Sequence, residues 1–349
     1  MTVGGVLPVI AVGALAILLA AAVVLARRRA GRAALACAEA SVRPVLFRAI
    51  DAGGMDDETF GALSPVEQRS LEAQARSLLP KLRGQDRETL GHLLDRLGAV
   101  DTARRQARSG RPGARARAGA FLGESGSPEA VRDLVRLLHD ADPQVRWTAA
   151  RALGRLGHTS ALSPLFSALE GPRPLPVDVV ADAVFQIRDC PISLLRQGLK
   201  SQAAPTRAVA VELLGRFQAL IAADEVMTLL HRDPSVEVRA RAARSLGRMG
   251  SPVSVESLVS CLDGGPAAMR AQAIWALGEI GDARALPVLR AVLTGTAHHM
   301  SELAADALSV MGLSATAVLE EVAATGDGRA AEAASRALAT RKELQPARS

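Results

Sequence analysis

The chain has 349 residues, enough for one or two domains or for one elongated array, and its formal net charge is +6. Hydrophobic residues make up 49% of the sequence, yet aromatic residues make up only 2% and tyrosine is absent. Compact globular cores usually depend on large aromatic side chains, so this composition argues against an ordinary globular domain and favours small, closely packed helices.

The first 26 residues carry no charge, and the run from residue 4 to residue 26 is long enough to cross a bilayer core of about 30 Å as a helix. Four arginines follow it, namely Arg27, Arg28, Arg29 and Arg32. By the positive-inside rule we expect a single-pass protein of the cell membrane, with its N-terminus outside and the rest of the chain in the cytoplasm. The four arginines are then candidates for contact with anionic lipid.

Residues 27–85 are predicted to form a basic, helical juxtamembrane stalk. Its first helix is expected to end near Pro44, before an acidic, glycine-rich break at 51–58. Ser64 and Glu67 then have the spacing of a capping box, which predicts the start of another helix.

The positive charge is concentrated in the N-terminal third. Residues 27–120 hold 18 Lys and Arg against 11 Asp and Glu, whereas residues 121–349 hold 24 against 25. Part of the excess is a run of arginines within 103–119, namely Arg104, Arg105, Arg108, Arg111, Arg115 and Arg117. This run is either a solvated helix end or a contact for lipid, nucleic acid or an acidic partner, and the sequence leaves these alternatives open.

A unit of roughly 31 residues repeats through the rest of the chain. The stretch DPSVEVRARAARSLGRMG at 233–250 aligns with DPQVRWTAARALGRLG at 142–157. Leucine–glycine pairs mark the repeats and end at Gly123, Gly154, Gly215, Gly247 and Gly278. In the unit between the second and third of these, Phe185 replaces the glycine. A fixed period of this length predicts a solenoid of stacked helix pairs.

Each unit is predicted to contain two helices. The first is represented by 127–140, whose apolar residues recur on one face, and the second by 145–156, which ends at Gly157. A helix pair cannot bury its apolar face alone, so neighbouring copies must supply a continuous core. We expect the array, with its capping region, to occupy 86–341, followed by a polar tail at 342–349.

These stretches resemble HEAT repeats of the short bacterial type, the HEAT-like units of phycobilisome lyases. The resemblance extends over roughly 112–341, and the whole arrangement is similar to bacterial membrane-anchored HEAT-repeat proteins. It implies an all-α fold, with an N-terminal single transmembrane helix followed by a HEAT-like α-solenoid. In HEAT families the Asp of the inter-helix turn and the Arg of the second helix often form a ladder between units. Asp142 with Arg146, and Asp233 with Arg239, match that pattern.

No active-site signature is present: the sequence lacks GxGxxG, GxxxxGK[ST], HExxH and GxSxG. The three cysteines, Cys37, Cys190 and Cys261, are far apart and lack metal-ligand spacing, so we expect reduced thiols, as in the cytosol. The sequence therefore predicts a protein that is not an enzyme, with no catalytic residue, metal or cofactor.

A repeating helical array provides surface more readily than an active site, so we predict a scaffold that binds a protein partner. The resemblance adds a possible accessory role in an envelope glycosyltransferase system. The candidate contact residues are arginines on the predicted concave side: Arg146, Arg151, Arg207, Arg239, Arg241 and Arg270. Whether these arginines bind a partner or hold the helices together is left open.

Two other classes of function remain as alternatives. One is a HEAT-like enzyme, similar to a bilin lyase or a DNA glycosylase, and the other is a membrane-tethered nucleic-acid binder that uses Arg104–Arg117. A DNA glycosylase needs a basic groove and stacking aromatics. The near-neutral, aromatic-poor array argues against it and against nucleic acid as a partner.

Overall fold

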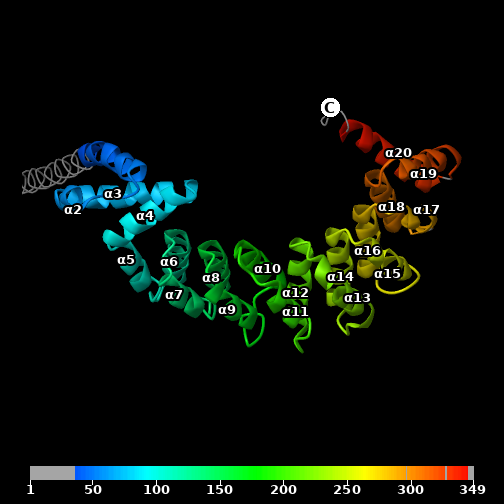
Figure 1. The fold of residues 1–349 in the computed structure, drawn as a ribbon, viewed down its shortest axis with the longest axis horizontal. Helices are drawn as coiled ribbons and strands as arrows, with labels where there is room; N and C mark the ends of the chain where they lie inside the picture. The colour runs from blue at the N-terminus through cyan, green and yellow to red at the C-terminus, as the bar shows by residue number, and fades with distance from the viewer. Residues whose placement is uncertain (1–35, 296, 327, 345–349) are drawn as a thin grey trace, which may run out of the picture. The chain divides into compact units, whose positions relative to one another are not determined.

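The computed structural model describes residues 36–295, 297–326 and 328–344, and every regular element within these ranges is a helix (Figure 1). The chain divides into two compact units, Met1–Leu137 and Leu138–Ser349. The helical array expected from the 31-residue period is therefore confirmed. The predicted stalk-to-array boundary at 85/86 does not coincide with this division and stays a prediction.

In the first unit, residues 36–51 are helical and continue through Pro44 without a break. The expected helix end at that proline is wrong, because Val42, Leu46 and Ala49 are buried on one face and packing holds the helix together. The remaining helices are α2 (Asp57–Gly61), α3 (Pro65–Leu78), α4 (Gln85–Arg96), α5 (Ala99–Gln106), α6 (Pro112–Ser125) and α7 (Ala130–Leu137). The capping box of Ser64 and Glu67 at the start of α3 is confirmed.

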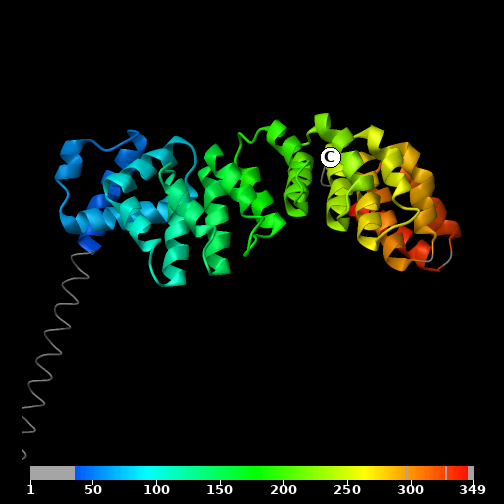
Figure 2. The same cartoon turned by 90° about the horizontal axis from the view of Figure 1, so that it is seen from below.

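In the second unit, long and short helices alternate along the chain. The second helix of each repeat is α8 (Pro143–Leu156), α10 (Val177–Gln186), α12 (Ala204–Arg216), α14 (Val236–Met249), α16 (Ala267–Ile280), α18 (His298–Val310) or α20 (Gly328–Leu344). The first helices are α9 (Leu162–Ser167), α11 (Ile192–Gly198), α13 (Ala223–Arg232), α15 (Val255–Ser260), α17 (Leu286–Leu293) and α19 (Leu313–Thr325). Within this unit the helix pairs follow one another as successive layers (Figures 1 and 2).

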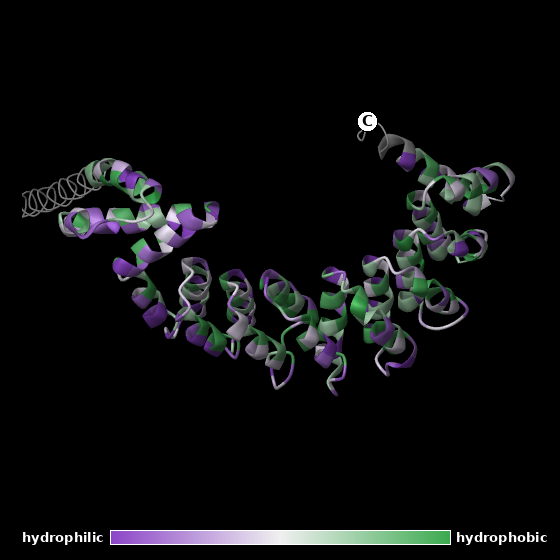
Figure 3. Cartoon of the chain, in the orientation of Figure 1, coloured by the Kyte–Doolittle hydropathy of each residue, from purple (hydrophilic) through white to green (hydrophobic). Residues whose placement is uncertain are grey.

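The second helices pack on one another through their glycines. A Cβ atom added at Gly247 would lie 2.6 Å from the Cα of Ala276, and one added at Gly278 would lie 2.8 Å from the Cα of Ala307. Only glycine permits this approach, so the leucine–glycine pair is a packing signature. Each helix carries apolar and polar segments, as expected of helices with one buried face (Figure 3).

Among the residues that the structure describes, no helix is long and apolar enough to cross a membrane. Even α20, with 17 residues, contains several charged side chains, whereas a span needs about 20 apolar residues. This finding contradicts the predicted localisation in the cell membrane, which we withdraw together with the transmembrane part of the fold class. The segment 1–26 and the lipid-contact candidates Arg27, Arg28, Arg29 and Arg32 lie outside the described residues.

Candidate functional site

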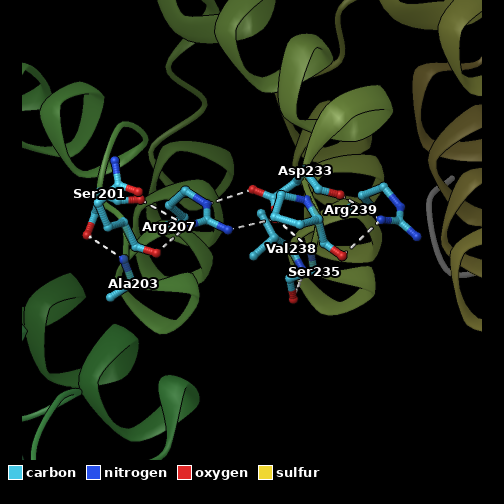
Figure 4. Close-up of polar contacts among 9 residues, drawn as sticks. Ser201, Ala203, Arg207, Asp233, Ser235, Val238 and Arg239 are labelled. Atoms are coloured by element: carbon cyan, nitrogen blue, oxygen red, sulfur yellow. Dashed lines mark hydrogen bonds and ion pairs between the residues drawn. The ribbon is translucent and has the colours of Figure 1, made fainter.

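Several of the repeat arginines close the turn before their own helix. Arg146 donates from Nη1 to the carbonyl oxygens of Asp140 and Ala141, both at 3.0 Å. Arg239 donates in the same way to the carbonyl of Asp233 at 2.6 Å (Figure 4). In each case the acceptor lies six or five residues before the arginine, where a helix end or turn leaves carbonyls unsatisfied. These contacts stabilise the repeat itself.

Arg207 closes its turn in this way and also bridges two repeats. Its Nη1 donates to the carbonyl of Ser201 at 2.9 Å, while its Nε and Nη2 donate to the Asp233 carboxylate at 2.7 and 2.8 Å (Figure 4). The Arg207 side chain is 9% exposed and that of Asp233 only 1%. The resemblance had matched Asp233 with Arg239, but the structure pairs this carboxylate with the arginine of the preceding repeat.

The electrostatics of this buried pair follow from its hydrogen bonds. Burial alone raises the pKa of Asp233, but hydrogen bonds from Arg207 and the Ser235 backbone, with the charges of Arg207 and Arg239, outweigh it. The pKa of Asp233 therefore lies below its ordinary value of 3.8. The hydrogen bond to Asp233 in turn raises the pKa of Arg207. The pair is ionised at neutral pH and links α12 to the turn before α14.

The ladder is not repeated at Arg146 and Arg270, whose buried Nε atoms have no hydrogen-bond partner among the described residues. Asp233 lies six residues before Arg239, which holds the arginine position of the repeat after Arg207. In the repeats after Arg146 and Arg270, that position is Val177 or Ser301, and the residue six before it is Gly171 or Gly295. The carboxylate that would accept from Nε is therefore missing from both of these turns.

A different set of side chains lies on one face of the second helices. They recur at intervals of three or four residues, which places them on one side of each helix. We call this set the second-helix stripe: Trp147, Arg151, Asp178, Asp182, Glu212, Arg216, Arg241, Arg244, Arg248, Gln272, Trp275, Glu279, Glu302 and Asp306.

Many charges of the second-helix stripe are paired across repeats. Glu212 is buried; it accepts a hydrogen bond from Arg248 at 2.5 Å and forms an ion pair with Arg216 at an Nε–Oε1 distance of 3.3 Å. Arg241 of α14 reaches past α12 to Asp178 of α10, with an Nη1–Oδ1 distance of 2.9 Å. The predicted contact residue Arg241 is thus already engaged within the array.

Two arginines of the stripe stand apart from these pairs. Arg151 and Arg244 are exposed, and neither has a carboxylate partner among the described residues. The guanidinium carbon of Arg244 lies 5.6 Å from the centre of the Trp275 ring, and Trp147, one turn before Arg151, is 38% exposed. Arg151 was among the sequence candidates. Arg244 was missed, although its spacing from Arg241 and Arg248 on one helix could have indicated it.

In the first unit, the basic run is partly committed to the fold. Arg104 donates from Nε to the buried carboxylate of Asp133 at 2.9 Å, and Arg108 lies 3.8 Å from the same group. Arg115 donates to the carbonyl of Ser109 at 2.9 Å. Arg111 is exposed at the start of α6. The nucleic-acid role of this run stays a prediction.

Within the described part of the chain there is no group of three or more His, Cys, Asp or Glu residues that could hold a metal ion. Cys190 and Cys261 are buried free thiols, and Cys37 is exposed. Burial raises the pKa of Cys190 to about 11 and raises that of Cys261 as well. Neither buried thiol forms the reactive thiolate at neutral pH.

Comparisons with known proteins give a consistent fold. The family model described as HEAT repeats matches residues 100–183, 192–269 and 255–339. A HEAT repeat-containing taxis protein of Halobacterium salinarum is 30% identical over 154 residues, which are 44% of this chain and 35% of that protein. The chain thus spans about a third of the length of this relative.

Solved structures show the fold alone. The crystal structure of a Kap121p mutant has a TM-score of 0.53 at 15% identity and covers 76% of this chain and 34% of its own. The complex of CpcE and CpcF of phycocyanin lyase from Nostoc sp. PCC7120 is 26% identical over 63% of this chain and 92% of that chain, with a TM-score of 0.35. The expectation that the chain is not an enzyme stays a prediction.

Proposed function

The chain belongs to the HEAT-repeat family, and from that premise we propose that it is a scaffold that binds another protein through the second-helix stripe. HEAT-repeat solenoids are typical of protein-interaction scaffolds, because stacked repeats expose an extended surface. This proposal assigns no catalytic step to the described residues. The role in an envelope glycosyltransferase system rests on resemblance alone and forms no part of it.

One observation carries the proposal: Arg151 and Arg244 are exposed and have no ion-pair partner in the described part of the chain, whereas Arg216, Arg241 and Arg248 of the same stripe are in ion pairs. Arginine and tryptophan are the residue types most enriched at energetic hot spots of protein interfaces. Trp275 holds the Arg244 guanidinium over its ring, which reduces the freedom that binding would remove. An acceptor on a partner could therefore pair with Arg244 without breaking any ion pair of the array.

The five other sequence candidates fit this proposal less well. Arg146, Arg207 and Arg239 close turns, and Arg241 is bound to Asp178. A fifth, Arg270, is half-buried with its Nε inaccessible. Among the predicted residues, only Arg151 is exposed and without a carboxylate partner in the ranges that the structure describes, so the proposal keeps Arg151 and adds Arg244.

Site-specific photocrosslinking in native cells tests the proposal. A photoreactive residue at Gln272, in the stripe, is expected to crosslink one protein partner, whereas one at Thr228, on first helix α13, is not. Crosslinks of equal yield from both positions, or from neither, would contradict the proposed surface. Mass spectrometry of the Gln272 product would identify the partner.

A further inference from the structure

The second unit also contains a groove on its first helices, away from the second-helix stripe. It has a volume of about 940 Å³ and runs between α9 with its leading turn and α11 with the following turn. Its lining residues are Thr159, Ser160, Leu162, Ser163, Phe166, Ser167, Glu170, Leu194, Gln197, Gly198, Lys200, Ser201 and Thr206. A hollow of this size is large enough to hold several side chains of a ligand.

The groove coincides with the least regular repeat. Here two short first helices follow one another, α9 with 6 residues and α11 with 7, whereas the equally short α15 lies between α13 with 10 and α17 with 8. The turn-closing arginine is replaced by Val177, and a proline-rich loop precedes α10. Two short first helices in succession leave the space between them unfilled, so the groove follows from the irregular sequence.

The walls of the groove are polar, and part of their hydrogen-bonding capacity is unused. Ser163 and Ser167 are exposed on α9 one turn apart, and neither hydroxyl has a hydrogen-bond partner among the described residues. Other exposed hydroxyls of the unit bond to their own helix, for example Thr228, which donates to the carbonyl of Asp224 at 3.0 Å, and Ser260, which donates to that of Ser257 at 2.8 Å. The serines of α9 are therefore free to bond a ligand.

The floor of the groove is apolar, formed by Leu162, Phe166 and Leu194. Hydroxyl groups both donate and accept, which suits a ligand with unpaired backbone N–H and C=O groups. A helical ligand satisfies its own backbone and would need only an apolar groove, whereas an extended peptide would use walls and floor together. Charge adds little, because Glu170 already accepts from Thr206 and Lys200 is the one cation in the lining.

The dimensions agree with this occupant. Along α9 the lining runs from Thr159 to Glu170, roughly 17 Å at the rise of a helix with a short 3₁₀ start. An extended chain advances about 3.3 Å per residue, so about five residues fill the groove. Alternate side chains of such a segment point to one side, and three of them would face the apolar floor.

We propose that the groove between α9 and α11 binds an extended peptide segment of a partner protein, of about five residues with apolar side chains at alternate positions. The serine hydroxyls of α9 bond the peptide backbone, and the apolar floor receives the side chains. This inference concerns a different surface from the second-helix stripe and does not depend on it.

The test selects peptides from a phage-displayed random heptapeptide library on the full-length chain and measures the affinity of the synthetic consensus peptide by fluorescence polarisation. Ser167→Trp fills the groove and is expected to weaken binding at least tenfold. Ser260→Trp is the matched control, since Ser260 is also the last residue of a six-residue first helix, and it is expected to leave binding unchanged.

Two further measurements separate an extended ligand from a helical one. N-methylation of an inward-facing backbone amide of the peptide is expected to weaken binding at least tenfold, and so is the double substitution Ser163→Ala/Ser167→Ala. The proposal is overturned if no peptide is enriched, or if Ser167→Trp and Ser260→Trp bind equally well. A consensus with helical spacing of apolar residues, insensitive to N-methylation, overturns it too.

Discussion

Two parts of the second unit differ in the residue that lies between neighbouring second helices. From α12 to α18 the helices approach closely through Gly215, Gly247 and Gly278, each of which lies against the backbone of the next second helix. At α10 the equivalent residue is Phe185, which is 43% exposed and stacks on Phe217 with a centroid distance of 5.2 Å. The regular repeats thus use small residues for packing, whereas the irregular repeat has an exposed aromatic residue on its second helix and the groove on its first helices.

The arginines do not follow this division. In the regular part, Arg207 joins two repeats through a buried carboxylate, but Arg270 of the same part has an Nε without a hydrogen-bond partner among the described residues. Arg146 also has such an Nε, and Val177 takes the arginine's place in the irregular repeat that follows it. Regular spacing therefore identifies the arginine positions, whereas the presence of a carboxylate in the next repeat decides which arginine joins two repeats.

The largest expected effect tests the buried pair. Arg207→Met should lower the free energy of unfolding by about 3–5 kcal/mol, because it leaves the Asp233 carboxylate buried and without its partner. Arg239→Met, which removes only bonds to carbonyls, should cost about 2 kcal/mol. Urea unfolding followed by circular dichroism measures both, and equal losses would show that the pair is not the stronger link.

Glycine packing gives the next largest difference. Gly247→Val should destabilise the protein by about 2–3 kcal/mol, because its Cβ would meet Ala276 at 2.6 Å. Phe185→Val places the same residue at the same repeat position and should cost about 1 kcal/mol or less, because Phe185 is partly exposed. If the two valine variants unfold at the same urea concentration, the glycine does not control the spacing of the helices.

The pH dependence sharpens the comparison of arginines. The folded-state pKa of Asp233 is lowered, so the stability it contributes is fully present above 3.8 and is lost as the pH falls from 3.8 through the folded-state value. The wild-type chain should therefore lose stability in this range relative to Arg207→Met/Asp233→Leu, which lacks both charges. A stability difference that stays constant from pH 6 to pH 2.5 would contradict the ionised pair.

The smallest effect concerns the stripe itself. Arg241→Ala should lower the free energy of unfolding by about 1 kcal/mol or less, since its hydrogen-bonded partners Asp178 and Glu237 are 76% and 60% exposed and water competes for them. The loss should diminish in 1 M NaCl, where charges are screened beyond about 3 Å. Arg290→Ala, which breaks the exposed pair with Glu321, is the matched control. If Arg241→Ala lowered the free energy of unfolding by more than about 3 kcal/mol, with or without 1 M NaCl, this contact would be part of the core.

Much of this fold could be predicted from the sequence, because the glycines that recur about every 31 residues lie where the backbones of neighbouring second helices approach closely. The second helix expected at 145–156 is α8, Pro143–Leu156, and its end at Gly157 is confirmed. The first helix expected at 127–140 is shorter and runs over Ala130–Leu137. The carbonyl groups of Ser127 and Pro128 accept from the backbone N–H groups three residues later, so these two residues form a turn before the helix.

The candidate site was less predictable, because side-chain pairing depends on which repeats come together. Asp233 is six residues before Arg239 in the chain, yet its carboxylate faces Arg207 of the preceding repeat. Arg241 likewise bonds Asp178, 63 residues away. Sequence spacing could identify the arginines of the array but could not show which of them are hydrogen-bonded or ion-paired within it.

The central claim is that the arginines that hold the array together and those that bind a partner are different residues. Quantitative affinity purification of the tagged full-length protein from native cells tests it most directly, with Arg151→Glu/Arg244→Glu compared with Arg173→Glu/Arg232→Glu, which makes the same charge change at exposed arginines outside the stripe. The account predicts that one protein partner falls at least tenfold in the first variant and is retained in the second, with both variants folded. Equal recovery of that partner from the two variants would contradict it.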